Sequence, residues 1–368
     1  MFIGLHLQTT ALPEGASASA LLGTIADAIT AAPHDPAPRC RIEREVLYAD
    51  LHPAAEAVRI AIEGEHVTLH ANTVTAGPGY HQHVVGLAER IADLLSAPWL
   101  PEGDTTGWRE TRDDRALERE FHDWATAAAA QILELHAEGM SGFALALPAG
   151  VAYTHDGLVA TQLGPRTEAW LIEARRDPAV AQDIFPWWSS AIDAAYFCGL
   201  ALTEMWRTVR WRAPLTDEER AVQERVVTWI ERAHGLDPEM QLPWAEQSEL
   251  LTYLSEESLR ATRAHLKAQS RAPARVGYRR QPVRLELSGG WYLTVPGELA
   301  ERWEERGTWV GWDETRSIFF NSFTAQASDE RAPLPTTDET LRRMPALDGD
   351  ELLELEVGEI RGYAALST

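Results

Sequence analysis

The residue types with the clearest chemical potential lie together in Gly77-Pro78-Gly79-Tyr80-His81-Gln82-His83. A predicted strand leads into this turn, and a predicted helix follows it. Free backbone N–H groups at a helix start attract anions, and histidines titrate near neutral pH. We therefore take Gly77, Gly79, Tyr80, His81 and His83 as candidates for a small-anion or phosphate site, or for a site with a general base. The simpler alternative is that the glycines only form the turn and that Tyr80 or a histidine packs over the helix end.

Metal and cofactor chemistry find little support in the sequence. His81 and His83 lie about 200° apart around a helix, so they do not share a metal ion. The sequence contains no Walker phosphate loop, no Gly-x-Gly-x-x-Gly after a strand, no His-Glu-x-x-His, no Cys-x-x-Cys and no Gly-x-Ser-x-Gly elbow. Lys267 is the only lysine, which argues against kinases and Schiff-base enzymes. We predict no metal site and no cofactor.

Tryptophan and arginine form a second concentration of interest. Six of the 14 tryptophans fall between residues 187 and 244, and Arg207, Arg210, Trp211 and Arg212 follow one another within two helical turns. Arginines on aromatic faces can form a clamp for a carboxylate or phosphate, or a partner-binding hot spot. The alternative is a helix-bundle core in which arginines stack on indole edges and pair with acids.

Aromatic side chains recur near the C-terminal end, where Trp309 and Trp312 are three residues apart in a predicted strand. Strand side chains alternate between faces, so these two tryptophans lie on opposite sides. We expect one of them to be core and the other to be an exposed anchor for a partner.

The pattern of predicted strands and helices around these residues indicates an α+β protein with three parts. Residues 1–100 form an N-terminal α+β unit, with alternating strands over 2–8, 57–63 and 66–72 and amphipathic helices over 17–30 and 80–95. Residues 111–267 form a Trp-rich, mainly helical middle. Its long helix begins at Asp113 or Asp114, and a later helix begins at a capping box formed by Thr216 and Glu219.

The remaining sequence predicts a basic linker over residues 268–283 and a C-terminal α+β unit over 284–368. Alternating strands open this unit, and a short helix is predicted over Glu298–Glu305. A hairpin of Trp309–Trp312 with Ser317–Phe323 follows, then a Pro-rich loop over 336–344 and two strands around Gly358. We expect both terminal units to contain mostly antiparallel sheets.

The chain is strongly acidic, with 368 residues and a net charge of −23. A negative surface repels phosphate backbones and anionic lipid and attracts basic partners, so we predict no nucleic-acid and no membrane binding. The start of the sequence lacks the features of a signal peptide, and two cysteines suggest no disulfide framework. We expect a cytoplasmic protein, and the preference for arginine over lysine suggests a GC-rich bacterial genome. Nothing in the sequence indicates an oligomeric state.

These observations favour a non-enzymatic bacterial interaction protein, of an accessory, adaptor or immunity type, that binds a protein partner through acidic and aromatic surface. The alternative is a small-anion-binding protein or a hydrolase with its site at residues 77–83. That alternative predicts a concave pocket with Tyr80, His81 or His83 at its wall. A third hypothesis, an acidic decoy for a nucleic-acid-binding protein, has the least support.

Overall fold

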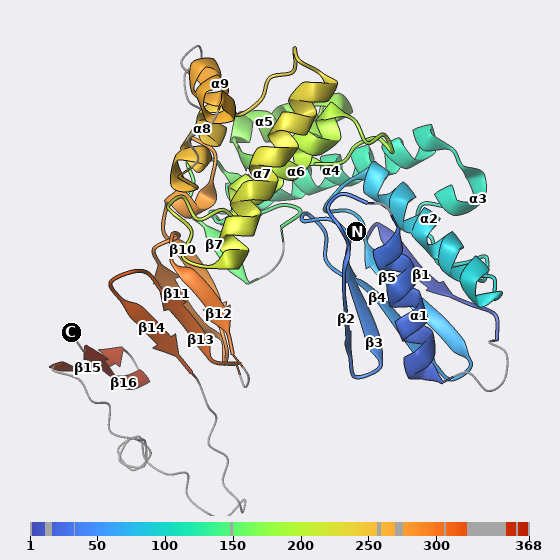
Figure 1. Ribbon diagram of the computed structural model, residues 1–368, viewed down its shortest axis with the longest axis horizontal. Coiled ribbons are helices and arrows are strands. Elements are labelled where there is room, and N and C mark those ends of the chain that lie inside the picture. The colour runs from blue at the N-terminus through green and yellow to red at the C-terminus, as the bar shows by residue number, and fades with distance from the viewer. Residues whose placement is uncertain are drawn as a thin grey trace, which may run out of the picture.

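The computed structural model confirms the predicted α+β class (Figure 1). It describes residues 2–11, 17–32, 34–147, 150–255, 259–268, 275–304 and 307–321, together with the strands over 351–357 and 360–366. Within these ranges, no helix is long and apolar enough to cross a membrane.

The N-terminal unit is a five-stranded antiparallel sheet with two helices packed on it (Figure 1). Its strand order is β1-β5-β4-β3-β2. The elements are β1 (Gly4–Gln8), α1 (Ala18–Ala31), β2 (Arg39–Glu43), β3 (Val46–Asp50), β4 (Val58–Glu63), β5 (His66–Asn72) and α2 (Pro78–Leu95). The predicted strands and helices are present, and β2 and β3 add a hairpin that is not among the predicted elements. Alternate residues of β5, Val67, Leu69 and Ala71, are buried under the helices.

The middle of the chain is mainly helical, as predicted. Its helices are α3 (Trp108–Thr111), α4 (Asp114–Ala137), α5 (Glu168–Ala174), η1 (Pro178–Ile184), α6 (Ala194–Arg207), α7 (Asp217–Leu236), α8 (Trp244–Tyr253) and α9 (Leu259–Ala268). A small sheet of β6 (Phe143–Ala144), β8 (Val159–Thr161) and β9 (Gly164–Arg166) lies between them in sequence. Asp113 caps α4, and Thr216 accepts the Glu219 N–H at the start of α7. The Glu219 carboxylate accepts the Leu215 N–H, so only one half of the capping box forms.

The C-terminal part contains two small antiparallel sheets around a shared apolar core. One sheet joins β7 (Val151–Tyr153) to β10 (Val283–Leu287) and β11 (Trp291–Val295), and the other joins β12 (Ala300–Trp303), β13 (Trp309–Trp312) and β14 (Ser317–Phe320). β15 (Glu351–Val357) and β16 (Ile360–Leu366) form a hairpin on either side of Gly358. The Pro-rich loop over 336–344 and the end of the predicted β14, Phe323, lie outside the described residues.

The helix predicted over Glu298–Glu305 is wrong, because residues 300–303 form β12. Ala300 lies opposite Trp312 and Trp303 lies opposite Trp309. The segment has good helix formers, but pairing with an aromatic strand outweighs that weak preference.

The predicted linker contains packed residues where the structure describes it. Tyr278 is buried and stacks on Tyr153, and Tyr278 exchanges hydrogen bonds with the backbone of Thr161. Residues 269–274 lie outside the described ranges. The domain boundaries stay predictions, but β7 pairs with β10 across one of them.

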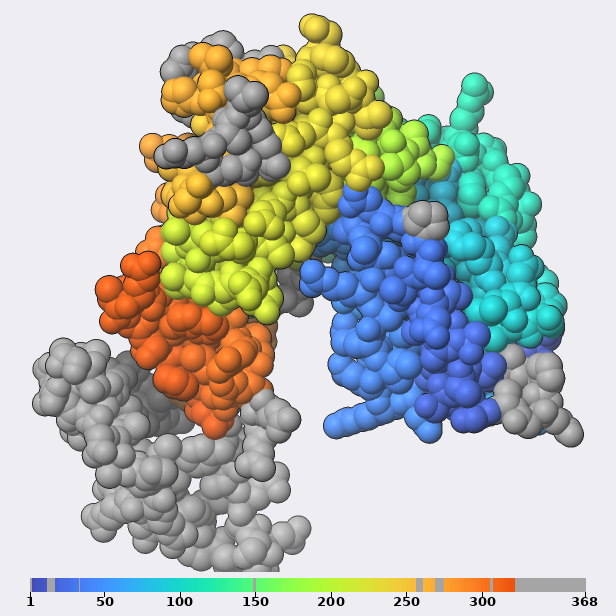
Figure 2. Space-filling view, in the orientation of Figure 1, coloured from blue at the N-terminus to red at the C-terminus, as the bar shows by residue number. Residues whose placement is uncertain are grey.

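One apolar core runs from the N-terminal sheet through α2 into α6, α7 and α8. The two C-terminal sheets have a core of their own. In Figure 2 a hollow separates the N-terminal unit from these sheets, and the helices span it on one side. The helical middle therefore connects the N-terminal unit to the C-terminal sheets.

A half-buried carboxylate between two buried arginines attaches the C-terminal sheets to the helices. Glu301 of β12 accepts from Arg210 at 2.7 Å and from Arg279 at 2.6 Å, and its other oxygen accepts from Trp309 Nε1 at 3.3 Å. Burial acts to raise the pKa of Glu301, but the two guanidinium groups outweigh it and lower that pKa. Burial and the neighbouring Arg279 lower the pKa of Arg210 to about 10.

We predict that Glu301→Gln destabilises the protein by about 3 kcal/mol, because it leaves two buried guanidinium groups without a countercharge. Chemical denaturation measures this loss. Glu304→Gln is the matched control, since Glu304 pairs with the exposed Arg302 and such pairs contribute less than about 1 kcal/mol. Equal effects of the two substitutions would contradict a structural role for the Glu301 cluster.

Candidate functional site

The turn before α2 is built for close contact with the loop Trp187–Ser189. Gly77 caps the helix with a φ of 114°, in the left-handed region that favours glycine. A Cβ on Gly79 would lie 2.3 Å from the carbonyl oxygen of Ser189. The Trp187 N–H donates to the Ala76 carbonyl at 2.9 Å, and the Gly79 N–H donates to the carbonyls of Trp187 and Trp188, each at 3.1 Å. The Gly79 amide, a candidate anion donor, is therefore used by the protein itself.

His81 and Tyr80 are fully buried in the protein interior and are not among the residues that line the cavity beside α2. The ring nitrogens of His81 contact Thr73 Oγ1 at 2.9 Å, Thr106 Oγ1 at 3.1 Å and Asp104 Oδ1 at 3.2 Å. Burial acts to raise the pKa of Asp104, but His81 and the N–H groups of Arg109 and Thr106 hold that pKa well below its usual range. Tyr80 is fully buried, and burial raises the pKa of its hydroxyl.

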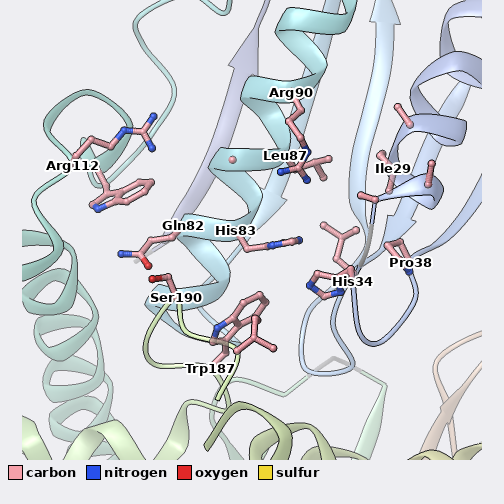
Figure 3. Close-up of a pocket in the computed structure, with 18 of the residues that line it drawn as sticks. Ile29, His34, Pro38, Gln82, His83, Leu87, Arg90, Arg112, Trp187 and Ser190 are labelled. Carbon is pink, nitrogen blue, oxygen red and sulfur yellow. The ribbon is translucent and has the colours of Figure 1, made fainter. Parts of the chain in front are cut away.

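His83 lies on another face of α2, at the wall of a cavity of about 820 Å³ between α1, α2 and the loop after Trp187. Its ring centroid is 4.4 Å from that of His34 and 5.3 Å from that of Trp187. Figure 3 shows His83 extending from α2 toward His34, with Gln82 and Ser190 together beside the first turn. From α2 the cavity is lined by Gly79, Gln82, His83, Gly86, Leu87 and Arg90. These positions recur at intervals of three and four residues, which places them on one helix face.

Burial keeps the histidines at this site in their neutral form. The pKa of His83 is lowered to about 3 by burial, His34 and Arg90. Burial also lowers the pKa of His34; the hydrogen bond to Pro36 opposes the shift and Arg90 adds to it. His34 Nδ1 lies 2.9 Å from the Pro36 carbonyl, which only accepts. The proton of neutral His34 is therefore on Nδ1, and Nε2 is an acceptor.

Behind the cavity, a third histidine completes an aromatic cluster around Trp187. His52 stacks on Trp187 with 5.6 Å between the ring centroids, and Tyr196 makes an edge contact with the same indole at 4.6 Å. The pKa of His52 is lowered to about 3, first by burial and then by His34, His83 and Arg207. The Ala54 N–H donates to His52 Nδ1 at 3.1 Å, so the proton lies on Nε2.

Several polar groups at the cavity have no partner in the described part of the chain. His34 Nε2, Gln82 Oε1 and Trp187 Nε1 are buried without a hydrogen bond there. His83 and the exposed Arg90 likewise have no hydrogen bond or ion pair within the described ranges. Arg112 and Asp114, by contrast, are paired with Glu89 and with Gln82 and Trp108 respectively.

The described residues contain no group of three or more His, Cys, Asp or Glu side chains placed to hold a metal ion. The site instead combines a guanidinium, neutral imidazoles and an indole N–H with an aliphatic wall. This combination can bind an anionic group by charge and hydrogen bonds and can cover an apolar body.

The arginine-rich segment after α6 is occupied by internal contacts. Arg207 donates to Gln162 and to the Pro53 carbonyl, Arg210 binds Glu301, and Arg212 forms two hydrogen bonds with Glu219. Trp211 is buried, with the Arg280 guanidinium 3.5 Å from its ring centroid. Of the C-terminal pair, Trp309 is core and Trp312 is half-buried beneath Arg302.

Sequence reasoning locates His83 but misses the residues that surround it. His34, Trp187 and Arg90 are 49, 104 and 7 positions away from His83 in the chain. Arg90 is recoverable from helical spacing, since it follows His83 by two turns. His34 and Trp187 lie in irregular segments with no periodic pattern to indicate their direction.

Searches against protein-family models, curated proteins and solved structures each found no match to this chain.

We predict that acid destabilises the fold through His52. An unfolded histidine has a pKa near 6.5, whereas that of folded His52 is about 3. Below pH 6.5 the unfolded chain binds a proton that the folded chain does not. The free energy of unfolding is therefore highest above pH 6.5 and decreases as the pH falls toward 3. Between these two pH values, one such histidine should lower the free energy of unfolding by about 1.4 kcal/mol per pH unit.

Urea denaturation between pH 8 and pH 5 measures this slope. His52→Asn retains an acceptor for the Ala54 N–H and should reduce the slope by one histidine's share. Above pH 7.5 the stability curves of the variant and the wild type should run parallel, which serves as the internal control. An unchanged slope in the variant would show that His52 does not remain neutral.

Proposed function

We propose that this chain binds a small molecule carrying an anionic group in the cavity between α1 and α2. The observation that carries the proposal is the collection of unpartnered polar atoms on residues that line the cavity, those of His34, Gln82 and Trp187 within the described residues. A buried polar atom without a partner costs about 1–3 kcal/mol. A bound ligand, or water in its absence, would supply the missing partners.

The charge at the cavity supports an anionic group on the ligand. A Cβ on Gly86 would lie 3.9 Å from Arg90 Nη1, so the guanidinium lies over Gly86, one turn from His83. Among the charged groups that line the cavity, Arg112 and Asp114 already have partners. Arg90 therefore supplies the positive charge, and neutral His83 can donate or accept a hydrogen bond beside it.

The proposed protein binds its ligand and does not act as an enzyme. That it is bacterial and cytoplasmic stays a prediction from the sequence. Gly77 and Gly79 serve by letting the Trp187 loop close the end of the cavity. His83 is the one predicted side chain at the wall, and Tyr80 and His81 support it from the interior.

Filling the cavity at Gly86 should block binding. Gly86→Leu adds a side chain at the cavity lining, where its Cβ would make an ordinary contact with Arg90 Nη1 at 3.9 Å. Overlap with a ligand costs about 1–3 kcal/mol, or about fivefold to 150-fold in affinity. The fluorescent anion anilinonaphthalene sulfonate is the probe. Leucine is a better helix former than glycine, so the free energy of unfolding should not fall.

Gly23→Leu is the matched control, because Gly23 lies inside α1, outside the cavity lining, and an added Cβ there meets no atom within 4 Å. It should bind the probe like the wild type. Equal binding by the wild type and Gly86→Leu would place the probe elsewhere and remove the support for this site.

A protein partner is the second candidate function, favoured by exposed aromatic side chains in the C-terminal sheets. Phe319 is 70% exposed and Trp303 is 50% exposed, and Trp291 and Tyr292 are also exposed. Large apolar groups left in solvent are typical of partner-binding surfaces. A negative surface would add attraction for a basic partner.

Co-purification from the native host tests this candidate. A stoichiometric partner should be retained by the wild type and lost by Phe319→Ser. Ile42→Ser, which changes a 45% exposed side chain of β2, should retain it. A partner lost equally from both variants, or the absence of any stoichiometric partner, would argue against the C-terminal surface.

A further inference from the structure

The two sides of the cavity differ in chemistry. The side formed by the end of α1 and the segment after it is mostly aliphatic: it includes Ile29, Pro38 and Leu51 beside the single imidazole of His34, with Leu87 of α2 facing them. Figure 3 shows Ile29 and Pro38 across from Leu87 and His83, with Gln82 and Ser190 on the other side of the helix start. A ligand that fills the cavity therefore meets an apolar wall along one part of its length.

Among the described residues that line the cavity, one cation is available to a ligand. Arg112 is paired with Glu89, and its guanidinium stacks on Trp108 at 4.5 Å from the ring centroid. Asp114 accepts from Gln82 and Trp108. Arg90 has no ion pair among the described residues, so one charge on the ligand is compensated and a second is not.

Arg90 and the apolar wall lie next to one another on the same helix face. The Arg90 guanidinium lies over Gly86, and Leu87 is the next residue after Gly86 in the chain. A molecule with its charge at Arg90 can therefore lay an apolar body against Leu87 and Ile29. A guanidinium binds a carboxylate through two parallel hydrogen bonds.

From this arrangement, and resting on the function proposed above, we infer that the ligand is an organic monocarboxylate with an apolar body. Arg90 binds the carboxylate with His83 beside it, and the apolar body lies against Ile29, Pro38 and Leu87. Inorganic phosphate fits this cavity less well, because it carries more charge than Arg90 compensates and has no apolar part to cover.

A series of straight-chain carboxylates tests the inference. Acetate, butyrate, hexanoate and octanoate are titrated into the full-length protein by calorimetry, and each is also measured by its displacement of anilinonaphthalene sulfonate. Affinity should rise about fourfold per added methylene while the chain still gains contact with the wall. Hexanoate should bind more tightly than hexanol and more tightly than inorganic phosphate.

Arg90→Gln should remove the preference for hexanoate over hexanol and leave the gain per methylene in place. The matched control is Arg119→Gln, an exposed arginine of α4 outside the cavity lining, which should preserve both. Gly86→Leu should abolish the series altogether, and Gly23→Leu should not affect it.

The outcomes separate this inference from the function on which it rests. The inference is overturned if affinity does not depend on chain length, or if hexanoate and hexanol bind equally well. The proposed function survives that result if Gly86→Leu still blocks binding of anilinonaphthalene sulfonate or phosphate. Failure of Gly86→Leu to change the binding of every probe overturns both.

Discussion

The contact of Trp187 with the first turn of α2 is the interaction on which most of the structure depends. Its backbone joins the turn through hydrogen bonds to Ala76 and Gly79. Its indole is packed among His34, His52, Tyr80, His83 and Tyr196. The same residue thereby merges the N-terminal core with that of the helical middle, closes the end of the cavity and desolvates the histidines. A single large side chain sets both the architecture and the electrostatics of the site.

Local patterns in the sequence were sufficient for most elements of the fold. The alternation in β4 and β5 and the spacing in α2 and α4 identify buried faces directly, because each face repeats with the period of its element. The failure at residues 300–303 has a physical reason: a short segment takes its conformation from its partner strand, here the adjacent β13, and its own helix preference does not reveal that pairing. The site was predictable only in part for the same reason, since His34 and Trp187 reach His83 through tertiary packing.

The arginines show how an acidic chain uses its few cations. Arg207, Arg210 and Arg212, whose cluster suggested a surface clamp, each bind acceptors within the protein. A guanidinium has five donors in a fixed plane, so it can join several segments at once. In this protein the internal pairing fixes the C-terminal sheets to the helices. Arg90 differs from these three arginines, because its charge stays available at a cavity.

The docking of Trp187 on Gly79 also has a consequence for the order of events during synthesis. Residues 77–83 leave the ribosome more than 100 residues before the loop that covers them. Chains fold as they are made, with N-terminal units first, so the sheet and its two helices can form early while Tyr80 and His52 still lack their cover. Closure of this core waits for residues 187–196 to emerge. During that interval the nascent chain presents an apolar surface at the start of α2, and that surface is where we expect a chaperone to bind.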